Sequence, residues 1–353
     1  MRKIAILGST GSIGCRTLDV IDHLGGFEVQ ALTCHSNYQL LAEQAAKYKP
    51  KLQTQDLIEI VTSDQVDEVV IAIMGAAAIA PTLAAIRARK RVMIATKEVL
   101  VMAGDLVMRE AKEHGVELIP IDSEHSSLFS MLRDLPANEI EKLILTASGG
   151  PFFKHSQEDL ANITIADALN HPRWKMGSKI TIDSSTMMNK GLEIIEAHHL
   201  FSIPKEKIEV VIHPQSYIHA IVQLTDGTML AHIGPTDMAL PIQYALTHPK
   251  RQKSFLSPLN LAEVGKFEFY SPDMRKFPCL ALAIEALKKG GSLPCFMNAA
   301  NEKLVSRFLK GEISWQEIGV RLKNLMSQNS LIIDPDLDQL IKTDRKAREL
   351  AAL

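Results

Sequence analysis

Two carboxylates stand two residues apart in the run IPIDSEH, Ile119 to His125. In an extended backbone, side chains at positions i and i+2 point to the same face, so Asp122 and Glu124 can converge on one point in space. Two hard oxygen ligands at one point suggest a divalent metal ion. The alternative for an isolated Asp-x-Glu pattern is a solvated junction between a strand and a loop.

A second stretch with functional residue types runs from Ile180 to His199, ITIDSSTMMNKGLEIIEAHH. Its pattern predicts a strand that ends at Asp183, followed by a helix whose N-cap is Ser184 or Ser185. Upstream, Ser148 lies in the turn SGGPF. Its hydroxyl and the adjacent amides could bind a phosphate, or the serine could simply cap the turn.

On the predicted helix, Asn189 and Lys190 precede Glu193 by four and three residues, so the three side chains share one face. An amide, an ammonium and a carboxylate on one face suit a phosphate group beside a metal ion. The alternative is an exposed ion pair, which contributes little to stability.

The run NHPRWKMGSK, Asn170 to Lys179, lacks apolar periodicity and combines a His, a Trp and a Gly with a Pro. This composition predicts a mobile loop in which Trp174 can cover a ligand. The alternative is a tryptophan that anchors the loop into a core.

A predicted strand, Lys3 to Leu7, is followed by GSTGSIG and a helical pattern. This order is that of a dinucleotide-binding loop, because the helix amino terminus offers unpaired N–H groups to a pyrophosphate. Gly8, Gly11 and Gly14 have the spacing G-x-x-G-x-x-G rather than G-x-G-x-x-G. Glycines that only form a tight turn therefore remain the alternative.

The next predicted strand, Glu28 to Thr33, runs into Cys34, His35, Ser36 and Asn37. A protein that prefers NAD usually carries an Asp or Glu here to bind the ribose 2'-hydroxyl. Since no carboxylate is present to repel a 2'-phosphate, the turn favours NADP.

Strands and helices alternate through the first 120 or so residues. This predicts an α/β fold with a doubly wound, Rossmann-like sheet whose ligands lie beyond the carboxyl ends of its strands. Four charged residues follow predicted strands at such ends: Lys97, Glu98, Asp122 and Glu124. The stretch Pro50 to Asp64 holds no predicted strand. We therefore expect the strand Glu28 to Thr33 to form the edge of the sheet or to be covered only by irregular chain.

From Lys142 the pattern predicts an α+β domain with a mostly open sheet, and from about Pro278 a small domain of amphipathic helices. Asp226 and Gly227 join two strands of the α+β domain and are a strong hairpin signal. An exposed sheet edge must be covered, so we expect a two-fold homodimer that meets through the hairpin Tyr217 to Ile233. The predicted domains are 1–121 for nucleotide binding, 122–255 for catalysis, metal binding and dimerisation, 256–276 as a linker, and 277–353 as the helical domain.

Composition narrows the choice of partners. The chain has 353 residues, 46% of them hydrophobic, and a formal net charge of -2, which gives no case for a nucleic-acid partner. The longest apolar run, Val69 to Ala80, is too short to cross a membrane. Four cysteines without C-x-x-C spacing argue against a disulfide framework or a structural zinc site. We expect a cytoplasmic protein without a membrane partner.

Eight motifs occur in one order: GSTGSIG, ATKE, PIDSEH, SGGPF, HPRWKMG, DSSTMMNKGLE, HPQS and NAANE. With them the chain closely resembles the 1-deoxy-D-xylulose 5-phosphate reductoisomerase family over nearly its whole length. The resemblance implies conversion of that pentulose phosphate into 2-C-methyl-D-erythritol 4-phosphate for isoprenoid synthesis, with NADPH and a divalent cation, Mg²⁺ or Mn²⁺. In this family a retro-aldol step rearranges the carbon skeleton, and hydride from NADPH then reduces the resulting aldehyde.

The resemblance also assigns roles residue by residue. The implied metal ligands are Asp122, Glu124 and Glu193. The implied catalytic residues are these three with Lys97 and His171. The implied contacts of the phosphorylated pentulose are Lys97, Ser123, Glu124, Ser148, His171, Trp174, Ser184, Asn189, Lys190 and Glu193. The implied NADPH contacts are Thr10, Gly11, Ser12, Ile13, Ser36, Asn37, Thr96, Glu98 and Gly177.

Two departures from the family pattern concern the cofactor. The turn CHSN replaces a turn that tends to carry a Gly and a Lys before the Asn, and Thr96 stands where the family tends to have Asn. We expect a weaker preference for NADPH over NADH, and unaltered chemistry.

Two other functions remain open at this point. One is a plain NADP-dependent dehydrogenase of a small aldehyde or hydroxy acid, which would not need three carboxylates and a phosphate cradle. The other is a cofactor-binding regulatory protein without catalysis.

Overall fold

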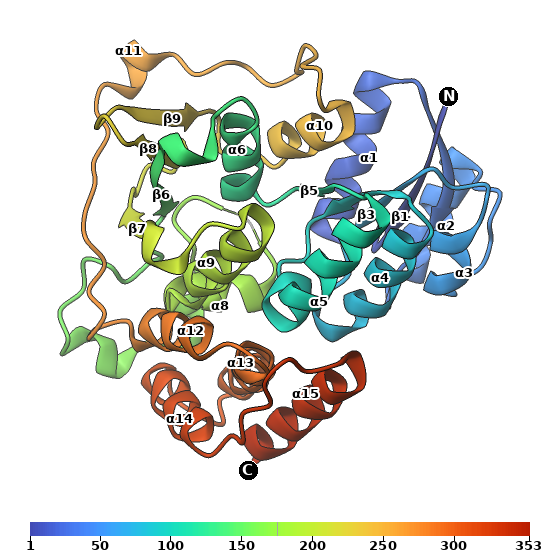
Figure 1. The fold of residues 1–353 in the computed structure, drawn as a ribbon. Helices are drawn as coiled ribbons and strands as arrows, with labels where there is room; N and C mark the ends of the chain where they lie inside the picture. Colours follow the sequence, from blue (N-terminus) through green and yellow to red (C-terminus); the bar gives the residue numbers. More distant parts are fainter. Residues whose placement is uncertain (175) are drawn as a thin grey trace. The chain divides into compact units, whose positions relative to one another are not determined.

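The computed structural model of the protein describes residues 1–174 and 176–353 (Figure 1). Contacts divide the chain into two compact units. The first consists of Met1–Val99, Asp105–Arg133 and Asp237–Leu259, and the second of Leu100–Gly104, Asp134–Thr236 and Asn260–Leu353. The domain boundaries expected from the sequence run once along the chain, whereas these units are discontinuous. The boundaries therefore stay a prediction about domains.

A five-stranded parallel sheet forms the centre of the first unit, in the order β2-β1-β3-β4-β5. Its strands are β1 (Arg2–Leu7), β2 (Phe27–Leu32), β3 (Glu68–Ile71), β4 (Arg91–Ile94) and β5 (Leu118–Pro120). Most strand residues are buried, which is typical of a parallel sheet covered on both faces. The predicted Rossmann-like domain is confirmed.

Helices cover both faces of this sheet because β2 lies on one side of β1 and β3, β4 and β5 lie on the other, and right-handed crossovers in opposite directions place their helices on opposite faces. On one face, Ile4 and Ile6 of β1 lie in an apolar cluster with Ile21 of α1 (Ser12–Leu24) and Ile242 of α10 (Ala239–Thr247). The crossover helices between β3 and β5 lie on the other face. The remaining helices of the amino-terminal half are α2 (Tyr38–Tyr48), α3 (Leu57–Thr62), η1 (Gly75–Ala78), α4 (Ile79–Arg87), α5 (Glu98–His114) and α6 (Ser123–Leu132).

The stretch from residue 50 to residue 64 holds the short helix α3 and otherwise irregular chain. Strand β2 is therefore an edge strand of the sheet. Leu52 crosses this edge and donates its backbone N–H to the Gln30 carbonyl at 2.9 Å. The expected loss of a regular outer strand is confirmed.

The second unit contains a four-stranded mixed sheet in the order β7-β6-β8-β9. Its strands are β6 (Ile140–Ala147), β7 (Ile208–Ile212), β8 (Ile218–Leu224) and β9 (Met229–Ile233). Strands β8 and β9 pair antiparallel across the Asp226-Gly227 turn, where Gly227 has a φ of 89°. The predicted hairpin is confirmed, and β9 is one of the two edge strands of this sheet.

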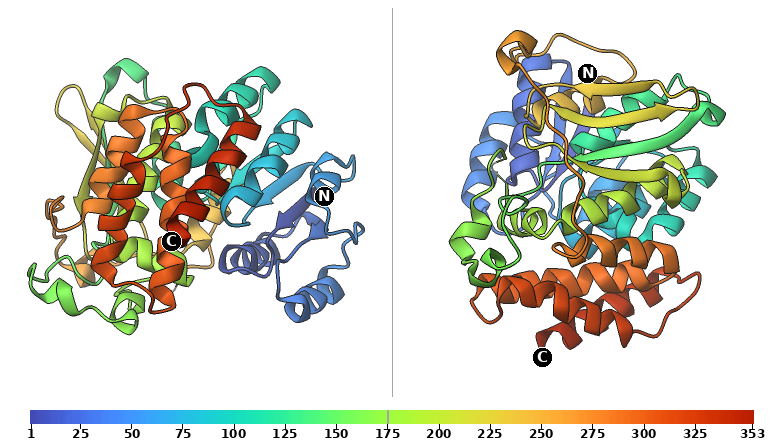
Figure 2. Two further views of the ribbon diagram at one scale, coloured as in Figure 1. Left: turned by 90° about the horizontal axis from the view of Figure 1, so that it is seen from below. Right: turned by 90° about the vertical axis from the view of Figure 1, so that its left-hand side faces the viewer.

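Helices make up the rest of the second unit. They are η2 (Ala137–Glu139), η3 (Asp159–Asn162), α7 (Ile165–Leu169), α8 (Ser178–Ser185), α9 (Met188–Phe201), η4 (Lys205–Lys207), α11 (Leu261–Val264), α12 (Pro278–Lys289), α13 (Leu293–Leu309), α14 (Trp315–Ser327) and α15 (Leu337–Ala352). Figure 2 shows the last four, in orange and red, gathered into one layer. They confirm the small domain of amphipathic helices predicted from about Pro278. Capping boxes at Ser314 and Asp336 start α14 and α15.

The strand predicted to end at Asp183 is wrong, because Ser178–Ser185 form helix α8. Asp183 is 1% exposed and pairs with Lys179 one turn earlier, at 2.8 Å, and with Asn301 of α13. These contacts override the strand preference of the β-branched run before it. The predicted N-cap is also wrong, since α9 begins after Met187, which has a φ of 59°.

Helices α9 and α12 pack closely at Gly191. A Cβ atom at Gly191 would lie 2.3 Å from the Cβ of Ala283. Alanine normally favours a helix over glycine by about 1 kcal/mol. Here steric overlap should win, so we expect Gly191→Ala to lower stability by about 1–3 kcal/mol.

Thermal and urea unfolding measure this effect. The double variant Gly191→Ala/Ala283→Gly moves the methyl group from one helix to the other and should recover part of the loss. A Gly191→Ala protein as stable as the wild type would contradict the close packing.

Candidate active site

The glycine-rich loop connects β1 to α1 in the first unit. Gly8 has a φ of 87°, and a Cβ there would lie 2.4 Å from the Ala72 carbonyl oxygen. A Cβ at Gly14 would lie 2.3 Å from the Gly8 oxygen, so this turn tolerates only glycine at both positions. The helix begins after Gly11 without a side-chain cap. Its open N–H groups fit the pyrophosphate of a dinucleotide.

Of the other residues predicted in this loop, Gly11 and Ser12 are exposed, and Thr10 and Ile13 are half-buried. The loop therefore presents backbone N–H groups and a serine hydroxyl to solvent at the start of α1. This arrangement is what the dinucleotide prediction requires of the loop.

The turn after β2 presents His35, Ser36 and Asn37 to solvent at the carboxyl end of the sheet. The Asn37 side chain caps α2 by accepting from the Leu40 N–H at 3.2 Å. No carboxylate occurs between Cys34 and Asn37. The turn can therefore accept a 2'-phosphate without charge repulsion.

Thr96 and Glu98 flank the start of α5. The Thr96 hydroxyl is buried and donates to the Ile73 carbonyl at 2.5 Å. This bond joins the turn after β4 to the turn after β3. The Thr96 hydroxyl is therefore bonded to the backbone rather than presented to a ligand. Glu98 is the first residue of α5.

Asp122 and Lys97 form an ion pair in which Lys97 is buried, at 5% exposed, and Asp122 is half-buried. Asp122 is the N-cap of α6 and accepts from the Ser123 N–H at 3.1 Å. The Ser123 hydroxyl donates to the Glu124 carboxylate at 2.6 Å. Carboxylates are favourable at this position because the helix dipole stabilises negative charge at an amino terminus.

The extended geometry predicted for Asp122 and Glu124 is wrong. Strand β5 ends at Pro120, and Glu124 lies in the first turn of α6. The Asp-Ser-Glu sequence starts a helix because an aspartate N-cap satisfies a free backbone N–H. The sequence pattern gave no role to His125, which is fully buried with its Nδ1 3.8 Å from the Asp122 carboxylate. A histidine one helical turn after an N-cap aspartate is the sequence signal that could have placed it beside Asp122.

Glu193 lies on α9 in the second unit and is 1% exposed. Asn189 donates an amide N–H to its carboxylate at 2.6 Å, and Lys190 forms an ion pair with it. The predicted shared face is confirmed. The alternative of an exposed ion pair is wrong, since Lys190 is also buried, at 4% exposed.

Ser148 and Ser184 lie at neighbouring backbone turns of the second unit. Gly150, two residues after Ser148, has a φ of 62°, and a Cβ there would lie 2.6 Å from the Ser184 carbonyl oxygen. Only glycine allows the SGGPF turn to approach the end of α8 this closely. The structure thus brings the two predicted phosphate contacts toward each other.

His171 contacts Ser148 with Nε2, at 2.9 Å from the hydroxyl oxygen. Its Nδ1 faces the backbone N–H groups of Arg173 and Trp174, at 3.2 and 2.9 Å. A nitrogen that accepts two N–H groups carries no proton, so the proton lies on Nε2 and points to Ser148. The serine oxygen also accepts from the Gly150 N–H at 3.2 Å, which directs the serine O–H away from both donors.

Burial lowers the pKa of His171 to about 4, so the imidazole is neutral at pH 7. The loop predicted to cover a ligand continues through Trp174, which is half-buried, and Gly177, the exposed N-cap of α8. Lys175 in this loop lies outside the described residues. The covering role of Trp174 stays a prediction.

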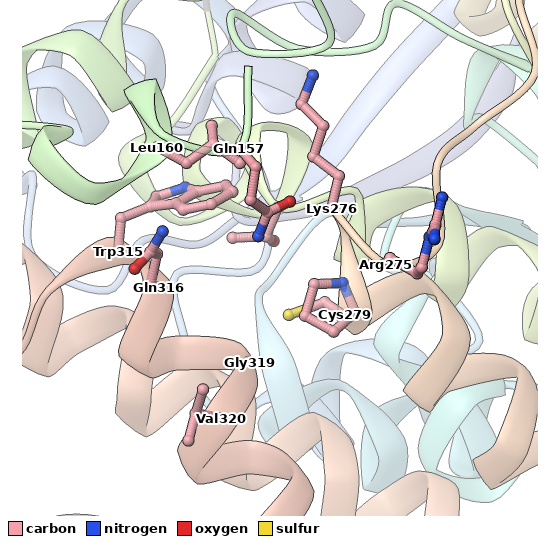
Figure 3. A pocket seen from close by; sticks show the side chains of 11 residues that line it. Gln157, Leu160, Arg275, Lys276, Cys279, Trp315, Gln316, Gly319 and Val320 are labelled. Atoms are coloured by element: carbon pink, nitrogen blue, oxygen red, sulfur yellow. The ribbon is translucent and has the colours of Figure 1, made fainter. Parts of the chain in front are cut away.

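A separate pocket of about 220 Å³ opens in the second unit (Figure 3). Trp315, Cys279 and Gly319 line it, together with the long side chains of Gln157 and Lys276. The Lys276 ammonium is bonded to the Phe153 and His155 carbonyls. None of the residues with a predicted role lines this pocket, so it is not part of the candidate active site.

Comparison with known proteins covers the whole chain. Sequence models of 1-deoxy-D-xylulose 5-phosphate reductoisomerase match residues 4–56 and 51–104, and models of its C-terminal domains match 118–201 and 233–350. The reductoisomerase of Protochlamydia amoebophila is 45% identical, covering 100% of this chain and 98% of that protein. That of Pelodictyon phaeoclathratiforme is 46% identical, covering 99% of each. This chain belongs to the 1-deoxy-D-xylulose 5-phosphate reductoisomerase family.

Solved structures of the family have the same fold. A reductoisomerase in complex with NADPH, fosmidomycin and magnesium superposes with a TM-score of 0.91 at 40% identity, covering 99% of this chain and 97% of that one. The Zymomonas mobilis reductoisomerase in complex with NADPH also has a TM-score of 0.91, at 38% identity, covering 99% and 98%.

This chain has fewer residues than the aligned length of its relatives. The alignment with the Protochlamydia amoebophila reductoisomerase spans 376 positions, against 353 residues here, so at least 23 positions have no residue in this chain. The family model matches the amino-terminal region as two segments that meet at residues 51–56. That is the irregular stretch beside β2.

The neutral His171 generates a pH prediction. The folded pKa of about 4 lies below the ordinary value of 6.5, so the unfolded chain binds the proton more tightly. The stability that His171 contributes is fully present above about pH 6.5 and is lost as the pH falls through 4. Nitrogen-detected NMR titration should give a pKa near 4 and a proton on Nε2.

The variant His171→Asn, which cannot titrate, should lose less stability between pH 6.5 and 4 than the wild type. A proton on Nδ1, or a pKa of 6.5 or above, would contradict the assignment.

Proposed function

We propose that this chain converts 1-deoxy-D-xylulose 5-phosphate into 2-C-methyl-D-erythritol 4-phosphate, using NADPH and Mg²⁺ or Mn²⁺, in isoprenoid precursor synthesis. Membership of the reductoisomerase family over the full length is the observation that carries this proposal. A plain dehydrogenase of a small aldehyde or hydroxy acid is not favoured, because it has no use for the buried carboxylates. An assay of NADPH oxidation with the pentulose phosphate, with and without EDTA, tests the proposal directly.

We infer that Asp122, Glu124 and Glu193 hold the divalent cation. Three carboxylates form an all-oxygen donor set, which suits Mg²⁺ or Mn²⁺ better than zinc. When bound, the cation polarises substrate oxygens and NADPH supplies the hydride. The neighbouring ammonium groups of Lys97 and Lys190 orient two of these carboxylates through their ion pairs.

The substrate phosphate is assigned to the polar side chains around the SGGPF turn and the start of α9. The proposed contacts are Ser148, His171, Ser184, Asn189 and Lys190. Neutral His171 donates from Nε2 to the Ser148 oxygen, which leaves the serine O–H available to a phosphate oxygen. Ser123 and Trp174 complete the proposed substrate contacts.

For NADPH, the proposed contacts are Thr10, Gly11, Ser12, Ile13, Ser36, Asn37, Thr96, Glu98 and Gly177. The glycine loop at the start of α1 would hold the pyrophosphate, and the turn after β2 the adenosine 2'-phosphate. Because the Thr96 hydroxyl is bonded to the backbone, this residue would act by shaping its turn.

We also propose a homodimer that meets through β9. This edge strand exposes Met229, Leu230 and Ile233, at 59, 36 and 41% of their surface. Exposed apolar side chains on both faces of an edge strand mark a surface that a partner strand can cover. The cytoplasm is the proposed location, which suits four cysteines that form no disulfide. Within the described residues, no helix combines the length and apolar character needed to cross a membrane.

The metal assignment predicts a separation of activity from cofactor binding. Glu193→Gln and Asp122→Asn should each lower kcat by at least about 100-fold, because a neutral amide is a weak ligand. The dissociation constant of NADPH should change less than about twofold, since other elements bind it. Steady-state kinetics and a fluorescence titration of NADPH measure both quantities.

Glu206→Gln is a matched control, because Glu206 is an exposed carboxylate of the second unit, 72% exposed. An equal loss of NADPH affinity in Glu193→Gln would count against the assignment.

The altered turn after β2 predicts a weak discrimination between NADPH and NADH. Adding a lysine before Asn37, in Ser36→Lys, should raise the ratio of kcat/KM values for NADPH over NADH by about tenfold, because an ammonium pairs with a 2'-phosphate. Gln39→Lys adds the same charge on α2 and should change the ratio much less. An unchanged ratio in Ser36→Lys would show that the 2'-phosphate lies elsewhere.

The dimer predicts a mass of two chains in light scattering at micromolar concentration. Replacing the exposed apolar residue Leu230 with Lys should shift the equilibrium toward the monomer, because a charge at the edge opposes strand pairing. A monomeric wild-type protein would reject the proposed interface.

A further inference from the structure

The outward edge of β2 ends beside the cofactor turn. Thr33 turns its backbone toward β1, where its N–H donates to Ile6 and its carbonyl accepts from the Ser9 N–H at 2.8 Å. Backbone groups alternate in direction along an extended chain, so Leu32 and Cys34 turn theirs outward. In a sheet with a further parallel strand, that strand would pair with these groups.

The Gln55 side chain takes the place of such a strand. Its Nε2 donates to the Leu32 carbonyl at 3.2 Å, and its Oε1 accepts from the Cys34 N–H at 3.1 Å. In a parallel ladder, one residue donates to the carbonyl before its partner and accepts from the N–H after it. The Gln55 amide makes this pair of bonds around Thr33, as the backbone of one strand residue would.

Two features make Gln55 a fixed part of this edge. The following residue, Asp56, caps α3 by accepting from the Ile58 and Glu59 N–H groups, so the backbone at Gln55 is held by a helix start. On its other side, Leu52 is bonded to Gln30. The segment therefore bonds one outward backbone group at each of Gln30, Leu32 and Cys34 without forming a strand.

The edge that Gln55 holds leads to both parts of the proposed cofactor site. Thr33, between its two bonding partners, accepts from the Gly8 N–H with its hydroxyl oxygen at 3.0 Å and thereby holds the glycine loop. Cys34 opens the turn that contains Ser36 and Asn37. A shift of this edge would move the turn relative to the glycine loop.

We propose that Gln55 is a positioning residue for NADPH: its side-chain amide replaces the absent outer strand and sets the turn that receives the adenosine 2'-phosphate. This inference rests on the proposed function for the identity of the cofactor. Its structural part concerns the protein without ligand and can be tested separately.

The test uses Gln55→Met, which keeps the length of the side chain and removes both hydrogen bonds. The control is Gln53→Met, the same change at an exposed residue of the same segment. We expect the dissociation constant and KM of NADPH to rise about 3- to 10-fold in Gln55→Met, as the loss of two exposed hydrogen bonds implies. The kcat at saturating NADPH and the KM of the pentulose phosphate should stay within about twofold of the wild type.

Hydrogen exchange of the Cys34 amide in the ligand-free protein supplies a second measurement. It should be faster in Gln55→Met than in the wild type and unchanged in Gln53→Met. Gln55→Glu keeps the acceptor for Cys34 and loses the donor to Leu32, so its Cys34 exchange rate should lie between those of the wild type and Gln55→Met. Only the exchange rate is compared for this variant, because its new carboxylate would itself repel the 2'-phosphate of NADPH. This variant also serves if Gln55→Met does not fold.

Three results would overturn the inference: an NADPH affinity of Gln55→Met equal to that of the wild type, unchanged exchange at Cys34, or a fall in kcat together with a rise in the KM values of both NADPH and the pentulose phosphate. The last would show a general structural role. If the wild-type protein neither binds NADPH nor turns over the pentulose phosphate, the proposed function fails instead. Faster Cys34 exchange in Gln55→Met would in that case still support the structural part.

Discussion

Two ammonium–carboxylate pairs hold the candidate catalytic residues, one in each unit of the chain, and of their four charged groups only the Asp122 carboxylate is half-buried rather than buried. Lys97 pairs with Asp122, and Lys190 pairs with Glu193. Removing such charges from water costs several kcal/mol per ion, and apolar residues of similar volume are often at least as stabilising. These pairs are therefore poorly explained by stability. They are well explained as carboxylates held in place for a cation, which is the role that the family resemblance assigns to Asp122 and Glu193.

The local fold around each pair also helps to hold its carboxylate in place. Asp122 is an N-cap, and Glu193 lies one helical turn after Asn189, so each carboxylate is oriented by a helix as well as by a lysine. Around the phosphate contacts, the close approach of Gly150 to Ser184 plays the corresponding part. The neutral state of His171 adds a fixed hydrogen-bond donor rather than a charge. Backbone geometry therefore sets where the functional side chains lie. The ion pairs with Lys97 and Lys190 set the charge around the carboxylates.

The parallel sheet of the first unit imposes a second constraint, because its loops meet only at the carboxyl ends of its strands. Loss of the outer strand shortens the sheet on the side farthest from Lys97 and Asp122, so the catalytic residues keep their supporting strands β4 and β5. The consequence falls on the edge at β2, where Leu52 bonds the Gln30 carbonyl and the Gln55 side chain bonds the Leu32 carbonyl and the Cys34 N–H. A chain can dispense with an edge strand when irregular backbone and an amide side chain supply the same hydrogen bonds.

The sequence by itself determined the elements whose signals are local. The strand–glycine–helix order at Gly8, the hairpin at Asp226 and the missing strand after Pro50 are each written in a few adjacent residues, and each was confirmed. The shared face of Asn189 and Glu193 was predicted for the same reason, since helical spacing alone decides it. The family motifs added the roles of these residues, which no local pattern could supply.

Only the tertiary structure decided the features that depend on distant partners. The β-branched residues before Asp183 favour a strand locally, but Asn301, 118 positions later in the chain, binds that aspartate where it lies in a helix. The return of residues 237–259 to the first unit, with Ile242 in its core, depends on burying an apolar helix face against a sheet built earlier in the chain. The bonds of Gln55 to β2 arise only because the sheet ends there. In each case the deciding contact joins residues more than 15 positions apart or depends on an edge that the sheet leaves open. A local sequence pattern carries no information about either feature.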